Sequence, residues 1–300
     1  MSSKSLGILY GVLGVVLFSS KAVMVKLAYR YDVDTLDLLL FRMLFSLPFY
    51  ILILFLIRKK TSKTKIVTKD YAWLFLFGLI GYYLASYFDF LGLNYIKAGL
   101  ERIILFVYPT IVVFLNWLIF SKKITQVQFI AILVTYVGVL ITFWDELDVS
   151  GNEVLWGGFL VLLSAITYAS YLVGSGWLIP KFGVLRFTCY AMIVSTICIV
   201  LHYLVAGNWD FMNYPWPVYA YGLAMAIFAT LIPSFLVSAA IGKLGASNFS
   251  ILGSLGPIST ILLAFVFLDE KLTYWQLVGM LVVIFGVTYL SIQGKKRAKG

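Results

Sequence analysis

Long apolar stretches separated by short polar segments dominate the hydrophobic pattern of this chain. A membrane-spanning helix needs ~20 mostly apolar residues, and a scan at that length predicts ten spans. They cover residues 6–28, 35–57, 71–93, 98–120, 126–144, 155–178, 185–204, 217–240, 246–268 and 273–292. A transmembrane β-barrel would instead show alternating segments of ~10 residues, which the sequence lacks. The pattern therefore predicts an all-α polytopic membrane protein with connections too short for a soluble catalytic domain.

Composition supports this class. Hydrophobic residues make up 62% of the chain, charged residues 12%, and the mean hydropathy is +0.98. A soluble domain has about 45–50% apolar and about 25% charged residues. The net charge of +10 would favour a nucleic-acid partner in a soluble protein. In a membrane protein it more simply reflects basic cytoplasmic loops, so we expect a lipid bilayer and no nucleic acid.

The loop charges predict the orientation of the spans. Two sets of segments alternate along the chain, one with sixteen basic residues and one acid, the other with nine acids and three bases. The basic set includes Lys4, the run from Arg58 to Lys69, and the tail from Lys295 to Lys299. Because basic loops stay in the cytoplasm, we expect both termini to be cytoplasmic in a multi-pass protein of a bacterial-type plasma membrane.

The chain also contains an internal repeat. Sliding the sequence by 148 positions aligns residues 92–142 with 240–290 without a gap, and pairs Pro109 with Pro257 and Lys123 with Lys271. We interpret this as two five-helix repeats at 6–144 and 155–292, followed by a basic cytoplasmic tail at 293–300. Because five is odd, the second repeat is inverted relative to the first, an arrangement found in many secondary transporters.

The end of the second repeat resembles a known family. Leu268-Asp269-Glu270-Lys271-Leu272-Thr273, followed by Gln276, Gly279 and Gly286-Val287, is similar to the closing signature of an EamA domain, as is Gly256-Pro257. EamA domains occur in tandem in the drug/metabolite transporter superfamily. The resemblance implies ten helices in two inverted halves, a central cavity, and transport of small metabolites. The first repeat departs from the signature, since Ser121-Lys122 stands where the second has Asp269-Glu270.

Ionisable residues inside the predicted spans are candidate site residues, because each costs ~2.5–3.5 kcal/mol to insert at mid-helix. All six that we identify fall in the outer half of the first repeat: Lys21, Lys26, Arg42, Asp89, Glu101 and Arg102. With 1.5 Å per residue, Lys21 and Arg42 lie ~10 Å deep, and Asp89 and Glu101 ~5–6 Å deep. We expect Lys21 and Arg42 to bind an acidic group of the substrate. Asp89, Glu101 and Arg102 serve either ion coupling or charge pairing, and Lys26 snorkels to the interface.

The second repeat offers polar and aromatic groups rather than charges. Ser164, Thr167, Tyr168 and Tyr171 share one helical face, and we assign Thr167, Tyr168 and Tyr171 to the opposing wall of the cavity. Interhelical hydrogen bonding would explain the same stripe. Prolines 109, 233 and 257 are expected to kink their helices.

These features favour a secondary transporter that moves a small anionic or zwitterionic metabolite, such as an amino acid or organic acid, by alternating access. We favour export over import, and leave a homodimer open as a partner. A lipid-modifying membrane enzyme and a channel are the alternatives. The enzyme needs a catalytic constellation that the single histidine, His202, hardly supports. No metal-ligand spacing or phosphate loop indicates a metal or another cofactor.

Overall fold

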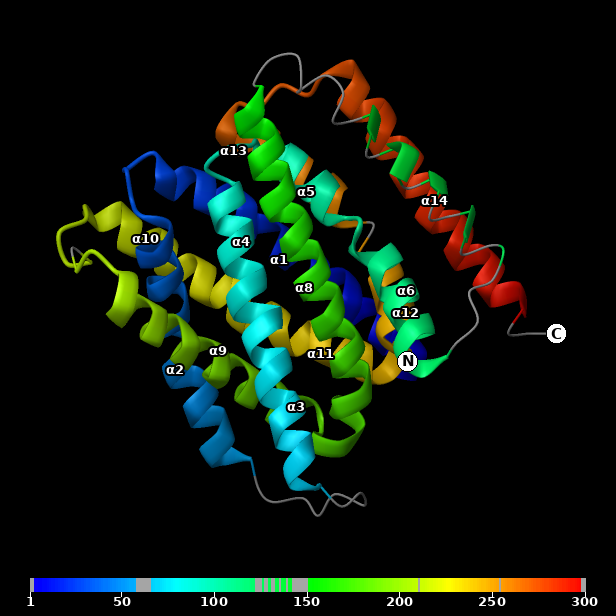
Figure 1. Cartoon of the computed structure of the whole chain (residues 1–300), viewed down its shortest axis with the longest axis horizontal. Helices are drawn as coiled ribbons and strands as arrows, with labels where there is room; N and C mark the ends of the chain where they lie inside the picture. The colour runs from blue at the N-terminus through cyan, green and yellow to red at the C-terminus, as the bar shows by residue number, and fades with distance from the viewer. Residues whose placement is uncertain are drawn as a thin grey trace.

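In the computed structural model of the chain, the described residues form helices and short loops and contain no strand (Figure 1). These are residues 3–57, 66–121, 126, 129–130, 133–134, 136–138, 140–141, 151–209, 211–253 and 255–297. The first part holds α1 (Ser3–Tyr29), α2 (Thr35–Leu56), α3 (Thr68–Gly78), η1 (Leu79–Leu84), α4 (Ala85–Gly92), α5 (Ala98–Leu105) and α6 (Tyr108–Phe120). The second part holds α8 (Asn152–Phe182), α9 (Val184–Ala206), α10 (Trp216–Ala226), η2 (Ile227–Leu231), α11 (Ile232–Leu244), α12 (Ala246–Leu252), α13 (Leu255–Leu268) and α14 (Tyr274–Arg297). The predicted all-α class is confirmed.

Seven helical segments of the described residues are long and apolar enough to cross a membrane. They are Ser5–Tyr29, Thr35–Leu56, Thr68–Gly92, Ala98–Phe120, Asn152–Phe182, Val184–Ala206 and Trp216–Leu244. Two shorter apolar helices, Leu255–Leu268 and Tyr274–Gly286, lie where the last two spans are predicted. Most of the predicted span 126–144 lies outside the described residues, so the total of ten stays a prediction.

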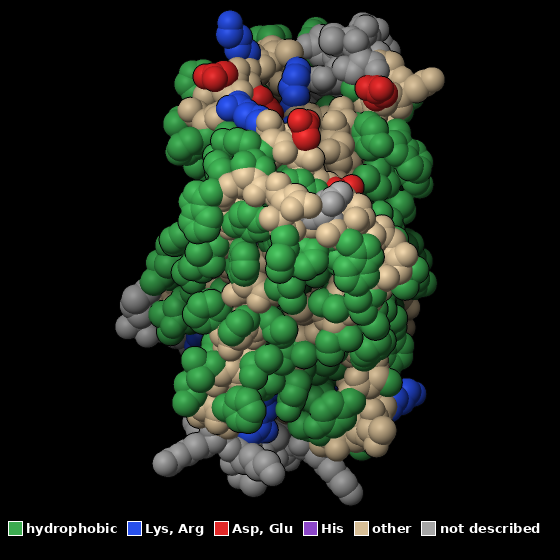
Figure 2. Space-filling model, turned by 90° about the vertical axis from the view of Figure 1, so that its left-hand side faces the viewer, with side chains coloured by type: hydrophobic (Ala, Val, Ile, Leu, Met, Phe, Trp, Pro, Cys, Tyr) green, Lys and Arg blue, Asp and Glu red, His purple; other side chains and the backbone are tan. Residues whose placement is uncertain are grey.

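The surface matches a protein embedded in lipid. On the face in Figure 2, a continuous band of hydrophobic side chains separates two ends, and the Asp and Glu side chains gather at one of them. Many large apolar residues are exposed, among them Phe55, Leu118 and Leu262. A water-soluble monomer rarely exposes so extensive an apolar surface.

Local irregularities recur at the repeat spacing of 148 residues. The π-helical turn η1 begins at Leu79 and η2 at Ile227. Ser121 and Asp269 both adopt a left-handed backbone, with φ of 52° and 56°. The break between α5 and α6 precedes Pro109, and the break between α12 and α13 precedes Pro257, which confirms that these prolines interrupt their helices. Shared irregularities are strong evidence of duplication, because apolar helices resemble one another by chance in sequence but not in such local breaks.

The two repeats pack through equivalent helix pairs. α1 lies against α11 and α13, and α8 lies against their repeat equivalents α4 and α6. A side chain at Gly7 of α1 would meet Lys243 and Leu244, and one at Gly157 of α8 would meet Tyr95 and Ile96. The contacted residues are 148 positions apart, and the two glycines 150. In Figure 1, α1 rises from the N-terminus while α8 descends, so the equivalent helices run in opposite directions. We call the end of the molecule where α5 begins the Glu270 end, and the end where α11 finishes the Lys243 end.

Candidate functional site

A small cavity lies between the two repeats. Its volume is about 30 Å³, enough for a water molecule but not for a metabolite. The first repeat contributes α1, α5 and α6 to its wall, and the second contributes α8, α11, α12 and α13. The lining side chains include Phe18, Ser19, Arg102, Tyr108 and Tyr168. The cavity therefore lies at the interface across which the two repeats would move.

Arg102 is the charged residue in this wall. Its side chain is 6% exposed, yet Nε and Nη2 donate no hydrogen bond within the described part of the chain. Nε lies 3.6 Å from Oε2 of the neighbouring Glu101, which is longer than a good hydrogen bond. Gly256 lies beside this side chain, and a Cβ atom there would make ordinary contact with Cδ of Arg102 at 3.7 Å. The guanidinium is thus buried while two of its nitrogen atoms donate no hydrogen bond to the described residues.

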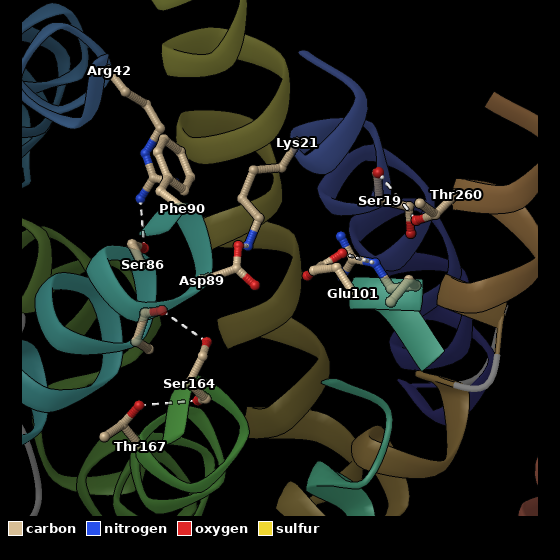
Figure 3. A network of polar contacts seen from close by, with 12 residues as sticks. Ser19, Lys21, Arg42, Ser86, Asp89, Phe90, Glu101, Ser164, Thr167 and Thr260 are labelled. Atoms are coloured by element: carbon tan, nitrogen blue, oxygen red, sulfur yellow. Dashed lines mark hydrogen bonds and ion pairs between the residues drawn. The ribbon is translucent and has the colours of Figure 1, made fainter. Parts of the chain in front are cut away.

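Behind Arg102 lies an ion pair. Nζ of Lys21 is 2.6 Å from Oδ2 of Asp89, and the two side chains are 4% and 0% exposed. Figure 3 shows the carboxyl groups of Asp89 and Glu101 pointing toward one another. Counted along the sequence, Lys21 lies deeper in the membrane than Asp89, but the lysine side chain is long enough to span this difference in depth. The ammonium group of Lys21 is therefore already paired with a carboxylate of the protein.

Arg42 lies apart from Arg102, on α2. Its Nη2 donates to Oγ of Ser86 at 2.8 Å, and its guanidinium stands over the ring of Phe90 at 5.0 Å from the centroid (Figure 3). A cation over an aromatic face is stabilised by the ring quadrupole. Nε and Nη1 of this buried side chain donate no hydrogen bond within the described residues. Arg42 lines none of the cavities that we describe.

The predicted wall residues of α8 are placed differently from one another. The hydroxyl of Thr167 donates within its own helix to the carbonyls of Leu163 and Ser164, both at 2.9 Å. Tyr168 lines the cavity, while Tyr171 is fully buried and packs against Tyr82 and Phe187. The neighbouring Ser164 donates to the carbonyl of Ala85 at 2.7 Å, which is interhelical bonding between the repeats. This helical face therefore contains both a residue that lines the cavity, Tyr168, and a residue that forms an interhelical hydrogen bond, Ser164.

Glu270 contacts the N-terminus of α5, the helix that carries Arg102. Its Oε1 accepts the backbone N–H of Ala98 at 3.0 Å, and its Oε2 accepts that of Gly99 at 3.2 Å. These are the first two residues of α5, which carries Glu101 and Arg102. A carboxylate at a helix N-terminus satisfies free backbone donors and favours the helix dipole. Glu270 thus joins the end of the second repeat to the first.

The opposite end is open. A pocket of about 370 Å³ lies at the Lys243 end, lined by Asn116 of α6, Trp177 of α8 and Ser247 of α12. The positions equivalent to its lining residues are covered at the Glu270 end. Gly99, the counterpart of Ser247, is buried, and Ala264, the counterpart of Asn116, is 2% exposed. The two ends of the inter-repeat interface therefore differ in access.

Sequence reasoning missed Asp37. It lies in the first turn of α2 and is fully buried, and its Oδ2 accepts the hydroxyl of Tyr214 at 2.7 Å. Burial raises the pKa of the Tyr214 hydroxyl, so this group stays protonated and donates. The signal was available, because position 37 is the third residue of a predicted span. Tyr214, which holds Asp37, lines an open polar pocket of about 640 Å³ at the Glu270 end.

His202 contacts aromatic rings. Its Nδ1 lies 3.0 Å from the hydroxyl of Tyr83, and its ring meets that of Tyr87 at 5.0 Å between centroids. In the described part of the chain, no group of three or more His, Cys, Asp or Glu side chains could hold a metal ion.

Comparison with known proteins supports the fold and the class. A sequence profile of the EamA-like transporter family matches residues 5–144 and 155–292. YcbK of Bacillus subtilis (strain 168), which is named an uncharacterized transporter, is 30% identical over 301 residues that cover 98% of this chain and 95% of YcbK. YyaM of the same organism, also named an uncharacterized transporter, is 22% identical over 250 residues that cover 82% of each chain. A solved structure known only as the crystal structure of a protein superposes with a TM-score of 0.70 at 14% identity, over 97% of this chain and 98% of the other.

Proposed function

The chain belongs to the EamA-like transporter family, and from this premise we propose that it is a secondary carrier of a small anionic or zwitterionic metabolite. The observation that carries the proposal is a group of five ionisable side chains buried beside the repeat interface. They are Lys21, Arg42, Asp89, Glu101 and Arg102, each no more than 6% exposed. Charges inside a membrane protein are costly and usually mark a substrate or ion pathway.

The sign of this group favours an anion. Three of the five side chains are basic and two are acidic, so the group is one positive charge in excess when all are ionised. In a low-dielectric interior, an excess charge attracts an opposite charge far more strongly than in water. Lys21 and Arg42 contribute to this potential, while Thr167, Tyr168 and Tyr171 belong to the facing helix of the second repeat. An acidic group of the substrate would bring the site to neutrality.

The proposed mechanism is alternating access. Next to the cavity, the pocket at the Lys243 end is open, whereas Glu270 covers the start of α5 at the other end. This is expected of a carrier whose substrate path opens to one side at a time. The 640 Å³ pocket at the Glu270 end shares no lining residue with the cavity and lies beside α2, α4 and α9. The basic loops predict that the Lys243 end faces the cytoplasm, and loading from the cytoplasm suits an exporter. Movement of the two repeats about the cavity would exchange which end is open. Both termini would then lie in the cytoplasm of a plasma-membrane protein.

Asp89 and Glu101 have different proposed roles. Asp89 neutralises Lys21, with which it makes a 2.6 Å contact. Glu101 lies between Asp89 and Arg102, and is the carboxyl best placed to exchange a proton when an anion approaches Arg102. A Glu101→Gln variant that kept proton-driven transport would contradict this role.

The function is tested by flux in proteoliposomes that contain the purified protein. We expect saturable uptake, accelerated by unlabelled substrate on the far side, from a panel of amino acids and carboxylates. Conductance without saturation would indicate a channel, and conversion of a lipid without flux would indicate an enzyme. The family and the names of its relatives point to a transporter rather than an enzyme. Lys21→Ala and Arg42→Ala should each weaken anion affinity, and unchanged affinity in both would remove them from the site.

A further inference from the structure

Resting on the proposed function, we propose that Arg102 and the rings of Phe18, Tyr108 and Tyr168 form the substrate-binding site, and that it takes a carboxylate attached to a flat apolar body. The sequence alone assigns the acidic group of the substrate to Lys21 and Arg42. The structure instead places Arg102 in the cavity wall, and each step below follows from that placement.

Arg102 has the donors that a carboxylate needs. Its Nε and Nη2 form one edge of the planar guanidinium, and neither donates a hydrogen bond within the described part of the chain. Oε2 of Glu101 pairs with Nε only at 3.6 Å, beyond hydrogen-bond distance. An arginine edge binds the two oxygens of a carboxylate through two parallel hydrogen bonds. A buried donor without a hydrogen bond is costly, so a ligand carboxylate would supply the hydrogen bonds that Glu101 does not.

Lys21 and Arg42 are less suited to direct contact. Nζ of Lys21 is 2.6 Å from Oδ2 of Asp89, and a ligand would have to displace this protein carboxylate. The guanidinium of Arg42 bonds to Ser86 and lies over the ring of Phe90, away from the cavity wall. Both side chains therefore act on the ligand through their charge rather than through contact.

Aromatic rings from both repeats form the rest of the wall. Tyr168 packs on Phe18 with centroids 6.0 Å apart and an interplanar angle of 17°, and meets Tyr108 edge-on at 5.2 Å. Flat apolar groups pack well in offset or edge-on contact with such rings. Phe249 of α12 and Val15 of α1 add further apolar side chains to the wall. The wall thus suits a ligand with one acidic end and a flat apolar body.

The present cavity of about 30 Å³ must widen to admit such a ligand. The 370 Å³ pocket at the Lys243 end is lined by four of the helices that also line the cavity, α6, α8, α11 and α12. Along α8, Tyr168 and Val173 are five residues apart, so the two spaces are separated by ~8 Å. A shift of Tyr108, Tyr168 and Phe249 would join them, and the ligand would enter from the open end.

Benzoate is the probe that tests this site, with benzamide as a neutral ligand of the same shape. Binding is measured by titration calorimetry on the purified protein in nanodiscs, for the wild type, Arg102→Gln, Arg102→Lys and Tyr168→Ala. We expect benzoate but not benzamide to bind the wild type, and Arg102→Gln to weaken binding at least about tenfold. Arg102→Lys, which keeps the charge without the planar fork, should bind with intermediate affinity.

Arg42→Gln is the matched control, because it removes a buried guanidinium outside the cavity. It should weaken benzoate binding much less than Arg102→Gln does. Equal losses in the two variants, or equal binding of benzoate and benzamide, would overturn the inference, as would a wild type that binds neither. A thermal unfolding transition verifies that each variant is folded. If Arg102→Gln does not fold, the comparison of Arg102→Lys with the wild type still tests the site. Benzoate that binds at Arg102, together with no flux of any amino acid or carboxylate of the panel in proteoliposomes, would leave this site standing and refute the carrier function instead.

Discussion

The ammonium group of Lys21 lies 2.6 Å from the carboxylate of Asp89, and neither side chain has more than 4% of its surface exposed. The two residues belong to different helices, α1 and α4. Breaking a buried ion pair on one side leaves an uncompensated charge in a medium of low dielectric constant. The pair is therefore a structural element of the first repeat as well as part of the charged group beside the cavity.

Asp89→Asn should lower the free energy of unfolding by about 3–5 kcal/mol, because it leaves Lys21 without its counter-charge. The measurement is thermal or denaturant-induced unfolding of the purified protein in detergent. The double variant Lys21→Met with Asp89→Leu should recover most of the loss, since apolar residues of similar size replace both charges. A loss below about 1 kcal/mol in Asp89→Asn would indicate that water reaches Lys21.

The crossing of α4 and α8 predicts a packing effect. A Cβ atom at Gly157 would lie 2.8 Å from side-chain atoms of Tyr95 and Ile96, and 3.2 Å from the carbonyl oxygen of Gly92. Gly157→Ala should therefore destabilise the protein by about 1–3 kcal/mol through overpacking. At Gly99 the same addition meets only ordinary contacts at 3.6 Å and 3.7 Å, so Gly99→Ala is the control. Similar unfolding temperatures for the two variants would contradict the close crossing.

Much of the architecture could be predicted from the sequence, because it depends on patterns that repeat along the chain. Apolar length predicted the seven long helices, and the π-helical turns and helix breaks of the structure recur at the offset of 148 residues found in the sequence. The partners of the buried charges could not be predicted in this way. Lys21 and Asp89 are distant in sequence and assigned to different depths, yet a long side chain brings them into contact. Depth along a helix does not say which way a side chain points.

The candidate site was predictable in part for the same reason. A charge inside a span is visible in the sequence, so Arg102 and Glu101 were found, whereas Asp37 was overlooked near a span end. Which arginine faces the cavity depends on how α5 rotates against α1 and α13. That rotation depends on how these helices pack, with Gly256 of α13 beside Ser19 and Arg102, and no periodicity of the sequence reports it.

Access to the two ends can be compared at equivalent residues. Ser247 lines the open pocket, whereas Gly99, 148 residues earlier, is buried under Glu270. In a background where Cys189 and Cys198 are changed to serine, Ser247→Cys should react with a membrane-impermeant maleimide several-fold faster than Gly99→Cys. Reagent added to one side of right-side-out or inside-out vesicles then reports sidedness. Reaction of Ser247→Cys only from outside the cell would reverse the proposed orientation.

The contact of Glu270 with α5 predicts that this residue influences the equilibrium between two conformations, one open at the Glu270 end and the other open at the Lys243 end. Both carboxylate oxygens accept backbone N–H groups at the start of α5, at 3.0 Å and 3.2 Å. The repeat equivalent of Glu270 is Lys122, which has no acceptor oxygen, so this kind of cap can form at one end only. Loss of a helix cap costs about 0.5–2 kcal/mol, and 1.4 kcal/mol changes an equilibrium about tenfold. Glu270→Gln keeps one acceptor oxygen but loses the charge and the second acceptor.

Glu270→Gln should therefore raise the maleimide reaction rate of Gly99→Cys by about three- to tenfold, because the conformation open at the Glu270 end becomes more populated. The rate of Ser247→Cys should fall in the same variant, since the two open conformations exclude each other. Asp269→Asn, at the exposed neighbouring residue, is the control and should change neither rate. Opposite shifts of the two rates distinguish a change in conformational balance from general loosening, which would raise both. If unfolding occurs at a lower temperature while both rates stay constant, Glu270 is a structural cap and not part of the gate.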